Sequence, residues 1–382
     1  MNKKLIAVAL AALPVAAMAD VTIYGTMAGS LQHDTVSNQA SQNRVEDDTS
    51  IIGFKGTEDL GNGLKTIWQI ENRLHLDGTG GTNDTLASRQ TWVGLDGGNL
   101  GQVRLGRINN FQNDQDNVDQ WQYNSEFYYN SPAKTDGQMS GANGLGIFTN
   151  TGARLKNSVR YDSATFAGFS GGLMYSFGEN KPKGSNADGS TSASDIAGLG
   201  LNYTYGPVSG HYSYQKEFNP ASQVGANRNQ TASKHYLEVD LNQDNLFVGA
   251  AYAYATGYDW QDTLAGDNGG TTASYTWNGN NSVGAQLKTR QAALSAAYAF
   301  GPIKPKITFA KGWDESANGN SISNSGYEQY VLGVDYALSK RTTAGVAYGR
   351  IKFDKNTALA QEWNAGSDVT VKTLAFTFAH NF

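Results

Sequence analysis

The feature that most constrains this chain is a two-residue alternation of side chains that recurs from one end to the other. Near the C-terminus, Leu374, Phe376 and Phe378 share one parity, while Ala375 and Thr377 share the other. A period of two places successive side chains on opposite faces of a β-strand. The pattern therefore predicts strands that are apolar on one face and polar or small on the other.

Composition indicates what such strands form. The chain has 45 Gly, 20 Tyr, 15 Phe and 7 Trp, only 16% charged residues, and a mean hydropathy of −0.47. After residue 19 no segment approaches 18 consecutive apolar residues, which excludes a bundle of membrane-spanning helices. Abundant glycine and aromatic residues in a chain of negative mean hydropathy are typical of an all-β, transmembrane antiparallel β-barrel, in which lipid-facing and water-facing side chains alternate.

The connectors between strands differ in length, with short turns alternating with long polar stretches as in outer-membrane barrels. The long stretches lie near residues 34–49, 76–85, 109–153, 180–194, 219–232, 257–285, 314–326 and 354–368. About sixteen strands are expected, at 21–32, 50–58, 64–75, 86–96, 101–108, 155–163, 169–179, 195–206, 208–218, 233–241, 246–256, 286–300, 303–313, 327–337, 341–353 and 369–382. An even number lets the first strand pair with the last, and counts of fourteen or eighteen also fit the pattern.

The first residues predict export. A charged start, Met1 to Lys4, precedes an apolar stretch and the small-residue site Ala17-Met18-Ala19. This is the order of a secretory signal peptide, expected to cover residues 1–19 and to leave a barrel of residues 20–382. Removing its two lysines leaves 27 basic and 34 acidic residues, a net charge of −7 that disfavours nucleic acid as a partner.

Metal and cofactor chemistry have no sequence signature here. The chain has no cysteine, so neither disulfides nor thiolate ligands are expected. The histidines are scattered singly, without the spacing of metal ligands: His33, His75, His211, His235 and His380.

Several segments together resemble one family. They are SIIGFKGTEDLGNGLKTIWQIE at Ser50–Glu71, DVTIYGT at Asp20–Thr26, RQTWVGL at Arg89–Leu95, GQVRLGR at Gly101–Arg107 and RLKNSVRYDSATFAGFSGGLMYSF at Arg154–Phe177. With the terminal Phe382, they resemble the trimeric general porins of beta-proteobacteria, the neisserial type. One departure is Ile51, where family members commonly have a basic residue, so one charge is missing if this position lines the lumen.

The resemblance implies a water-filled channel of the outer membrane for passive diffusion of ions and small hydrophilic solutes. It also implies a homotrimer that contacts outer-membrane lipid, lipopolysaccharide and the barrel-assembly machinery. Phe382, Phe378 and Phe376 are then expected to form the insertion signal. The third external loop is expected to fold inward and narrow the channel.

The candidate loop is residues 109–153, which contains one lysine and several acids. The acids expected at the constriction are Asp114, Asp116, Asp119 and Glu126. From the residues alone, an ordinary solvated external loop is equally compatible with this segment; the resemblance favours the inward fold.

Basic residues of the opposing wall follow from strand parity. Five lie opposite most of the apolar residues of their strands, namely Lys55, Lys65, Arg73, Arg104 and Arg160. A lipid-facing Arg or Lys near mid-bilayer would cost roughly 2–4 kcal/mol, which favours the lumen. Arg89 lies opposite Trp92 but shares parity with Val93, so its strand does not separate cleanly. The loop acids are expected to face Arg73, Arg89, Arg104 and Arg160.

Two other classes of barrel remain open. A barrel enzyme would need a nucleophile and a base, or paired carboxylates, near one rim, and no Ser–His pairing is indicated. An adhesin or structural barrel would have a sealed lumen. No catalytic residue is therefore assigned, and single-channel conductance separates an open channel from both rivals.

Overall fold

The structure is a computed structural model that describes residues 20–37, 40–76, 86–121, 144–147, 154–178, 195–218, 231–257, 276–277, 280–281, 287–317, 319–357, 360 and 366–382. The expected signal peptide and Glu126 lie outside these residues. Among the described residues, no helix is long and apolar enough to cross a bilayer.

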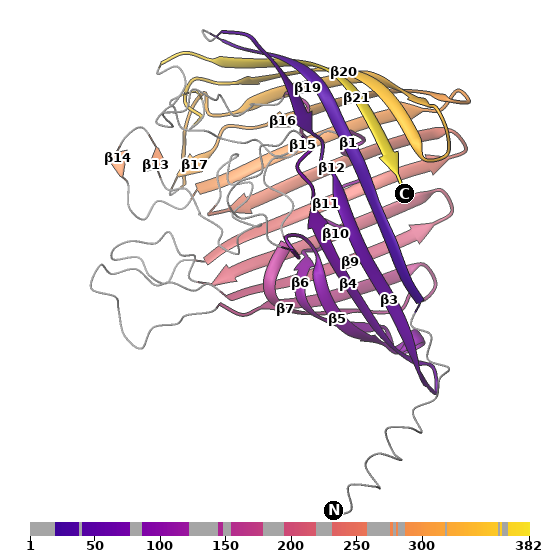
Figure 1. The fold of residues 1–382 in the computed structure, drawn as a ribbon. Helices are drawn as coiled ribbons and strands as arrows, with labels where there is room; N and C mark the ends of the chain where they lie inside the picture. Colours follow the sequence, from indigo (N-terminus) through magenta and orange to yellow (C-terminus); the bar gives the residue numbers. More distant parts are fainter. Residues whose placement is uncertain are drawn as a thin grey trace, which may run out of the picture.

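The strands form one closed antiparallel ring (Figure 1). In order around it they are β1 (Asp20–Val36), β3 (Ile51–Gly61), β4 (Leu64–Arg73), β5 (Thr91–Asp96), β6 (Gln102–Asn109), β7 (Arg154–Asp162), β8 (Phe169–Ser176), β9 (Asp195–Tyr205), β10 (Val208–Phe218), β11 (Thr231–Gln243), β12 (Leu246–Thr256), β15 (Leu287–Tyr298), β16 (Ile303–Gly312), β19 (Tyr327–Ala337), β20 (Thr342–Phe353) and β21 (Val369–Asn381). These sixteen strands confirm the expected β-barrel over the alternatives of fourteen and eighteen.

The ring closes between the two ends of the chain. Strand β1 pairs with β21 from Thr26 opposite Asn381 to Val36 opposite Val371. Beyond the ladder, the Phe382 N–H donates to the Gly25 carbonyl at 3.0 Å. On its other side β1 pairs with β3 from Asp20 to Thr26 and with β2 from Gly29 to Asp34, so β1 is joined both to the last strand and to the strands that follow it.

Shorter elements extend the loop end of the ring. Strand β2 (Gln42–Asp47) pairs with β1, and β17 (Ser316–Ala317) pairs with β15 and with β18 (Asn320–Ser321). A separate hairpin joins β13 (Thr276–Trp277) to β14 (Asn280–Asn281), and η1 (Gly98–Leu100) is a turn of 3-10 helix before β6.

The first hairpin corrects one expectation. The stretch 34–49 was predicted to be a long loop, but β1 runs to Val36 and β2 pairs with it from Asp47 to Gln42. Apart from Val36 and Val45 the side chains here are polar on both faces, so the alternation of hydropathy is weak although the backbone pairing continues. A break follows at Thr49, whose φ is 69°.

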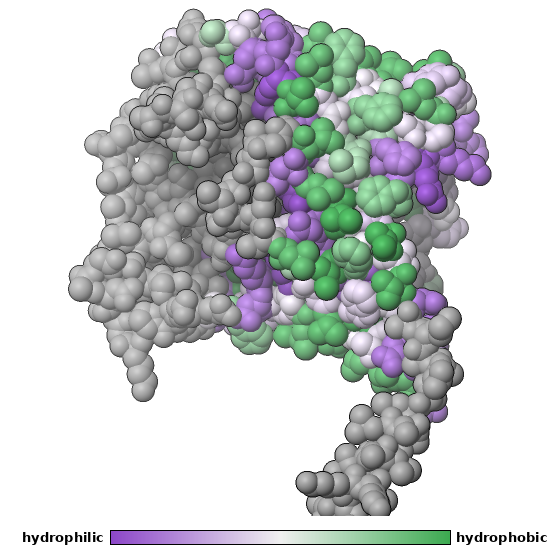
Figure 2. All heavy atoms as spheres, in the orientation of Figure 1, coloured by the Kyte–Doolittle hydropathy of each residue, from purple (hydrophilic) through white to green (hydrophobic). Residues whose placement is uncertain are grey.

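The two faces of the barrel differ as the alternation predicts. On β21, Phe376 and Phe378 are each 55% exposed on the outer face, whereas Thr373 and Ala375 on the inner face are fully buried. Figure 2 shows hydrophobic side chains gathered along the outer surface of the strands. The ring therefore separates an apolar exterior from an interior of polar and small groups.

Part of the connection between β6 and β7 lies inside the ring, against the inner wall. Its described residues, 110–121 and 144–147, are called the inner loop below. Asn110 donates to Gln215 of β10 at 2.8 Å, and the Gly144 N–H donates to the Thr373 hydroxyl of β21 at 3.1 Å. These contacts with strands on different parts of the ring confirm the inward-folded third loop.

Phe111 anchors the start of the inner loop by packing against a part of the inner wall that has no side chains. Its ring lies where side chains would otherwise project from three inner-face glycines, Gly172, Gly198 and Gly200. A Cβ added at Gly200 would lie only 2.3 Å from the Phe111 ring. Phe111 also packs with Ile108 and Leu155, so the anchor is apolar.

We expect Gly200→Val to destabilise the folded barrel by about 1–3 kcal/mol, because the added atoms would overlap the Phe111 ring. The free energy of unfolding in urea measures this cost, and protease cleavage within residues 110–121 should rise with it. Gly210→Val on β10 is the control, since no atom lies within 4 Å of a Cβ added there. Equal stability and cleavage in the two variants would contradict the anchor.

Candidate functional site: charged residues of the inner loop and wall

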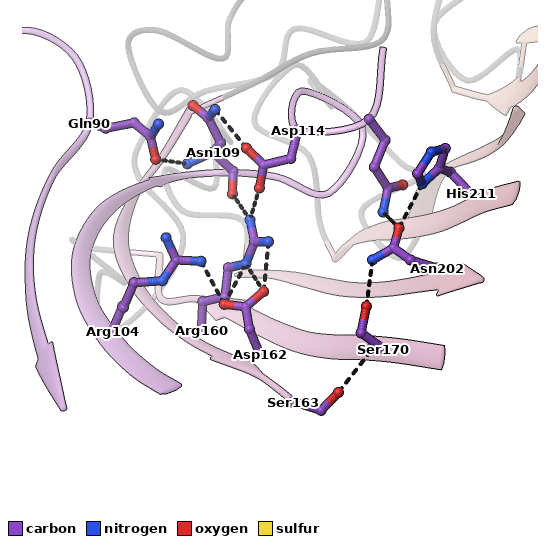
Figure 3. A network of polar contacts seen from close by, with 12 residues as sticks. Gln90, Arg104, Asn109, Asp114, Arg160, Asp162, Ser163, Ser170, Asn202 and His211 are labelled. Atoms are coloured by element: carbon purple, nitrogen blue, oxygen red, sulfur yellow. Dashed lines mark hydrogen bonds and ion pairs between the residues drawn. The ribbon is translucent and has the colours of Figure 1, made fainter. Parts of the chain in front are cut away.

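Asp114 joins the inner loop to the wall through Arg160 of β7. The Arg160 Nη1 lies 2.5 Å from Asp114 Oδ2, and Asn109 Nδ2 donates to the other carboxylate oxygen at 2.8 Å (Figure 3). The same Nη1 donates to the Asn109 carbonyl at 2.8 Å. Arg160 is almost fully buried, and its Cζ lies 4.1 Å from the centre of the Phe111 ring.

Arg104 and Arg160 are cross-strand neighbours on the inner face, and one carboxylate lies between them. Arg104 Nη2 is 2.6 Å from Asp162 Oδ2, and Arg160 Nη2 is 2.7 Å from Asp162 Oδ1. Figure 3 shows both guanidinium groups converging on Asp162. Like charges directly opposite one another destabilise a sheet, and the negative charge of Asp162 offsets the repulsion between these two arginines.

Arg73 and Arg89 are also held by carboxylates of the wall. Arg89 Nε lies 2.8 Å from Glu71 Oε1, and Arg73 Nε lies 3.5 Å from Asp47 Oδ2. Arg89 precedes β5, which begins at Thr91, so strand parity does not apply to it. This explains why the sequence pattern left its direction undecided.

Lys55 and Lys65 lie on the inner face nearer the short turns, away from the inner loop's contacts. The Lys55 Nζ lies 5.2 Å from the centre of the Tyr24 ring, and the register places Lys65 between Asp59 and Asp96. Ile51 lies opposite Arg73 on the same face as Lys55. The position that departs from the resembled family therefore lines the lumen, where an apolar side chain stands.

Asp116 contacts a different part of the wall. The Tyr236 hydroxyl of β11 is within hydrogen-bond distance of Glu238 and lies 3.2 Å from Asp116 Oδ1. Asn117 donates from its backbone N–H to Glu238 Oε1 and from its side chain to Asp240 Oδ2, each at 2.9 Å. The middle of the inner loop thus lies against carboxylates of β11.

Asp119 is half-buried further along the inner loop. Its Oδ1 accepts a hydrogen bond from the Trp121 N–H at 3.0 Å. Burial, and then the charge of Asp116, raise the pKa of Asp119 well above its usual range, and the positive charge of Lys306 on β16 opposes this effect. Lys306 donates to the Gln120 carbonyl at 2.8 Å and pairs with Asp335 at 2.7 Å.

Of the loop acids expected to face the wall arginines, Asp114 is in direct contact with one of them, Arg160. Asp116 and Asp119 lie instead near β11 and β16. The sequence analysis missed the inward carboxylates Glu238 and Asp240. Strand parity could have found them, because Glu238 and Asp240 alternate with Leu237 and Val239, which are about half exposed on the outer face.

The arrangement can order water and act on ions through charge, since its groups are arginines, lysines and carboxylates at the surface of a channel. Within the part of the chain that the structure describes, no group of three or more His, Cys, Asp or Glu side chains could hold a metal ion.

Comparison with known proteins identifies the family of this barrel. A family model described as Gram-negative porin matches residues 7–356. The chain is 33% identical to the major outer membrane protein P.IB of Neisseria meningitidis serogroup B over 93% of this chain and 95% of that protein. It is also 33% identical to the protein of the same name from Neisseria gonorrhoeae, with the same coverage.

Solved structures agree at the level of the fold. An anion-selective porin from Comamonas acidovorans superposes with a TM-score of 0.68 at 20% identity, covering 95% of this chain and all of that one. Salmonella typhi OmpF, in complex with daunomycin, gives a TM-score of 0.62 at 18% identity and covers 95% of this chain and 97% of that one. From the family match and the neisserial relatives together, the chain belongs to the Gram-negative porin family and forms a water-filled channel of the outer membrane.

Proposed function

We propose that this porin is a passive channel whose ion preference is set by two charged sectors of its lumen, joined by the inner loop. The observation that carries the proposal is the path of the loop, which contacts Arg160 at one end and Glu238 and Lys306 farther along. Small hydrophilic solutes and ions would cross the field between the sectors. Passage of this kind needs no catalysis, and we propose no enzymatic activity.

The arginine sector consists of Arg73, Arg89, Arg104 and Arg160. Each is held by a carboxylate, so the guanidinium groups have fixed positions rather than mobile ones. The electric field of charges in fixed positions keeps its direction relative to the channel, and it orders the nearby water.

The acidic sector consists of Asp116, Asp119, Glu238 and Asp240. These carboxylates accept hydrogen bonds from Asn117 and Trp121 of the inner loop and from Tyr236 of β11. Lys304 and Lys306 donate to Gln120 nearby. Glu126, the fourth acid expected at the constriction, lies outside the described residues.

The size of the effect follows from Coulomb's law. At about 7 Å in water, one unit charge changes an ion's energy by about 0.6 kcal/mol, which is close to RT. Removing one such charge should therefore change the local concentration of an ion by about threefold at low salt. At 1 M salt the Debye length is about 3 Å, and the effect should largely disappear.

We also propose how the chain is exported, oriented and assembled in the membrane. Residues 1–19 act as the export signal, and the long loops face the outside of the cell with the termini in the periplasm. The barrel-assembly machinery inserts the chain, and lipopolysaccharide surrounds its outer half. The working form is a homotrimer; one solved structure of this fold, OmpT of Vibrio cholerae, is described as a trimer form.

We expect Arg89→Gln with Arg104→Gln to raise the ratio of cation to anion permeability by about threefold or more, because Glu71 and Asp162 lose neutralising partners. The reversal potential of single channels under a salt gradient measures the ratio. Asp116→Asn with Glu238→Gln should shift it toward anions.

Lys288→Gln with Arg290→Gln is the matched control. It removes the same number of positive charges as the arginine variant, from the outer face of β15, where both residues are exposed. Unchanged reversal potentials in both lumen variants at low salt would show that selectivity is set at the mouths of the channel.

For the trimer we expect Ile23→Trp to release monomers. Ile23 is 59% exposed on the outer face of β1, beside Val21, and a larger side chain in a packed subunit interface costs about 1–3 kcal/mol. Leu201→Trp on β9, about half-way round the ring and 49% exposed, should leave the trimer intact because lipid accommodates added volume. Unheated gels and native mass spectrometry measure the oligomeric state. A wild-type protein that is monomeric in mild detergent contradicts the proposal.

Deleting Phe382 should strongly reduce insertion into the membrane. The residue closes the ring with two backbone hydrogen bonds to Gly25, at 3.0 and 3.2 Å, each worth about 1 kcal/mol. Its ring also covers Gly25, while Phe376 and Phe378 continue the apolar face. Phe166→Ala, at an exposed turn between β7 and β8, is the control. The membrane-inserted fraction measures the effect, and equal fractions for all three proteins would refute the assignment of an insertion signal.

A further inference from the structure

Two cations lie side by side on the outer face of the barrel near its loop end. Arg350 of β20 is directly opposite Lys372 of β21. Both belong to the outward parity, which Val346 and Phe376 show by their exposure of 38% and 55%. Like charges directly opposite one another destabilise a sheet, so this pair needs a compensating anion.

The chain supplies such an anion to the neighbouring cations. Lys352 lies 2.8 Å from Asp368 and 3.5 Å from Asp354, and Lys311 lies 2.9 Å from Glu328. Among the described residues, no ion pair includes Arg350 or Lys372; Arg350 instead has its Cζ 5.8 Å from the centre of the Tyr330 ring. Arg350 and Lys372 are therefore cations without an ion pair next to cations that have one.

The inner wall offers a comparison within the same molecule. Arg104 and Arg160 are also directly opposite one another, and there Asp162 lies between them at 2.6 and 2.7 Å. The fold thus compensates a like-charge pair with its own carboxylate where the pair faces the lumen. On the outer face, no carboxylate of the described residues lies between Arg350 and Lys372, and Glu328 interacts with Arg350 through charge without forming an ion pair with it.

The surroundings of the pair indicate the kind of molecule. Below it on the same face are Leu374 and Phe376, and the rings of Tyr330 and Tyr348 lie 6.4 Å apart beside it. Aromatic side chains that border an apolar band mark the level at which hydrocarbon meets lipid headgroups. Long cationic side chains are tolerated at this level because they reach the headgroups.

A second pair of cations lies on the outer face of the barrel, on β15. Lys288 and Arg290 share the outward parity of β15, and both are exposed. Arg290 lies opposite Tyr254, and its carbonyl accepts from the Trp313 N–H at 3.0 Å. Among the described residues, these two cations also have no ion pair.

We propose that Arg350 and Lys372 bind the phosphate of an anionic glycolipid of the outer leaflet, with its acyl chains along Leu374, Phe376 and Tyr348. Two cations on adjacent strands can both donate to one phosphate, and charge-assisted hydrogen bonds of this kind are short and strong. Lys288 and Arg290 meet the headgroups of neighbouring lipid. The assignment to the outer leaflet rests on the orientation proposed above, in which the long loops face outward.

The test is native mass spectrometry of the full-length porin in detergent, titrated with lipid A that carries both phosphates. Parallel titrations use lipid A with its phosphates removed, and inorganic phosphate. Arg350→Gln with Lys372→Gln is the variant. Lys340→Gln with Arg341→Gln is the matched control, since it removes one Lys and one Arg from the short turn before β20.

The wild type and the control should bind the phosphorylated lipid about tenfold more tightly than the dephosphorylated lipid, and the variant should lose this difference. Equal binding of the phosphorylated lipid by variant and wild type would overturn the proposal. So would equal binding of the two lipids by the wild type, or displacement of the lipid by millimolar inorganic phosphate. If the variant alone falls apart into monomers, the pair belongs to a subunit interface and the proposal is again overturned. Single-channel conductance should be unchanged in the variant, so a failure of the lipid site is distinguishable from a failure of the channel.

Discussion

The rest of this structure depends on the hydrogen bonds that join its first strand to its last. A backbone N–H or C=O left unpaired in hydrocarbon costs several kcal/mol, so an open sheet edge is not viable there. The ladder from Thr26–Asn381 to Val36–Val371 removes that edge, and the Phe382 N–H extends it to Gly25. Closure also creates an inside and an outside, and with them the two chemically different faces that every strand presents.

Once the ring is closed, the inner loop finds its polar partners on the inner wall. The outer face offers Leu, Val and Phe, whereas the inner face offers amides, hydroxyls and charges, such as Gln215, Thr373 and Lys306. Space is provided by small residues. Gly172, Gly198 and Gly200 leave the volume that the Phe111 ring occupies, so part of the high glycine content has a local purpose.

Like-charge pairs across neighbouring strands occur on both faces and are resolved differently. Inside, Asp162 holds Arg104 and Arg160 in fixed positions, and the resulting array of ion pairs can carry a stable field across the lumen. Outside, Arg350 and Lys372 share no such carboxylate among the described residues, and the surface there is suited to an anionic lipid. Under the two proposals, the same local arrangement would serve ion selection on one face and lipid contact on the other.

The sequence alone determined the class of the fold and most of its strands, because a period of two is a local property of the chain. The predicted spans 208–218, 246–256 and 327–337 agree with β10, β12 and β19 residue for residue. Parity also assigns Arg104 and Arg160 to the face where the structure places them. Local pattern failed at the first hairpin, where most side chains near the tip of β1 and β2 are polar on both faces, and at Arg89, which lies before its strand begins.

Only the tertiary structure decided which charges meet. Asp114 and Arg160 are 46 residues apart, and Asn117 reaches Glu238 across 121 residues, so neither contact has a sequence signature. The path of the inner loop depends on the shape of the wall, where the glycines of β8 and β9 admit Phe111 and the strands beyond supply partners in turn. Strand parity specifies a face for each side chain, but the partners on that face are set by the register of the closed ring and by the loop that lies within it.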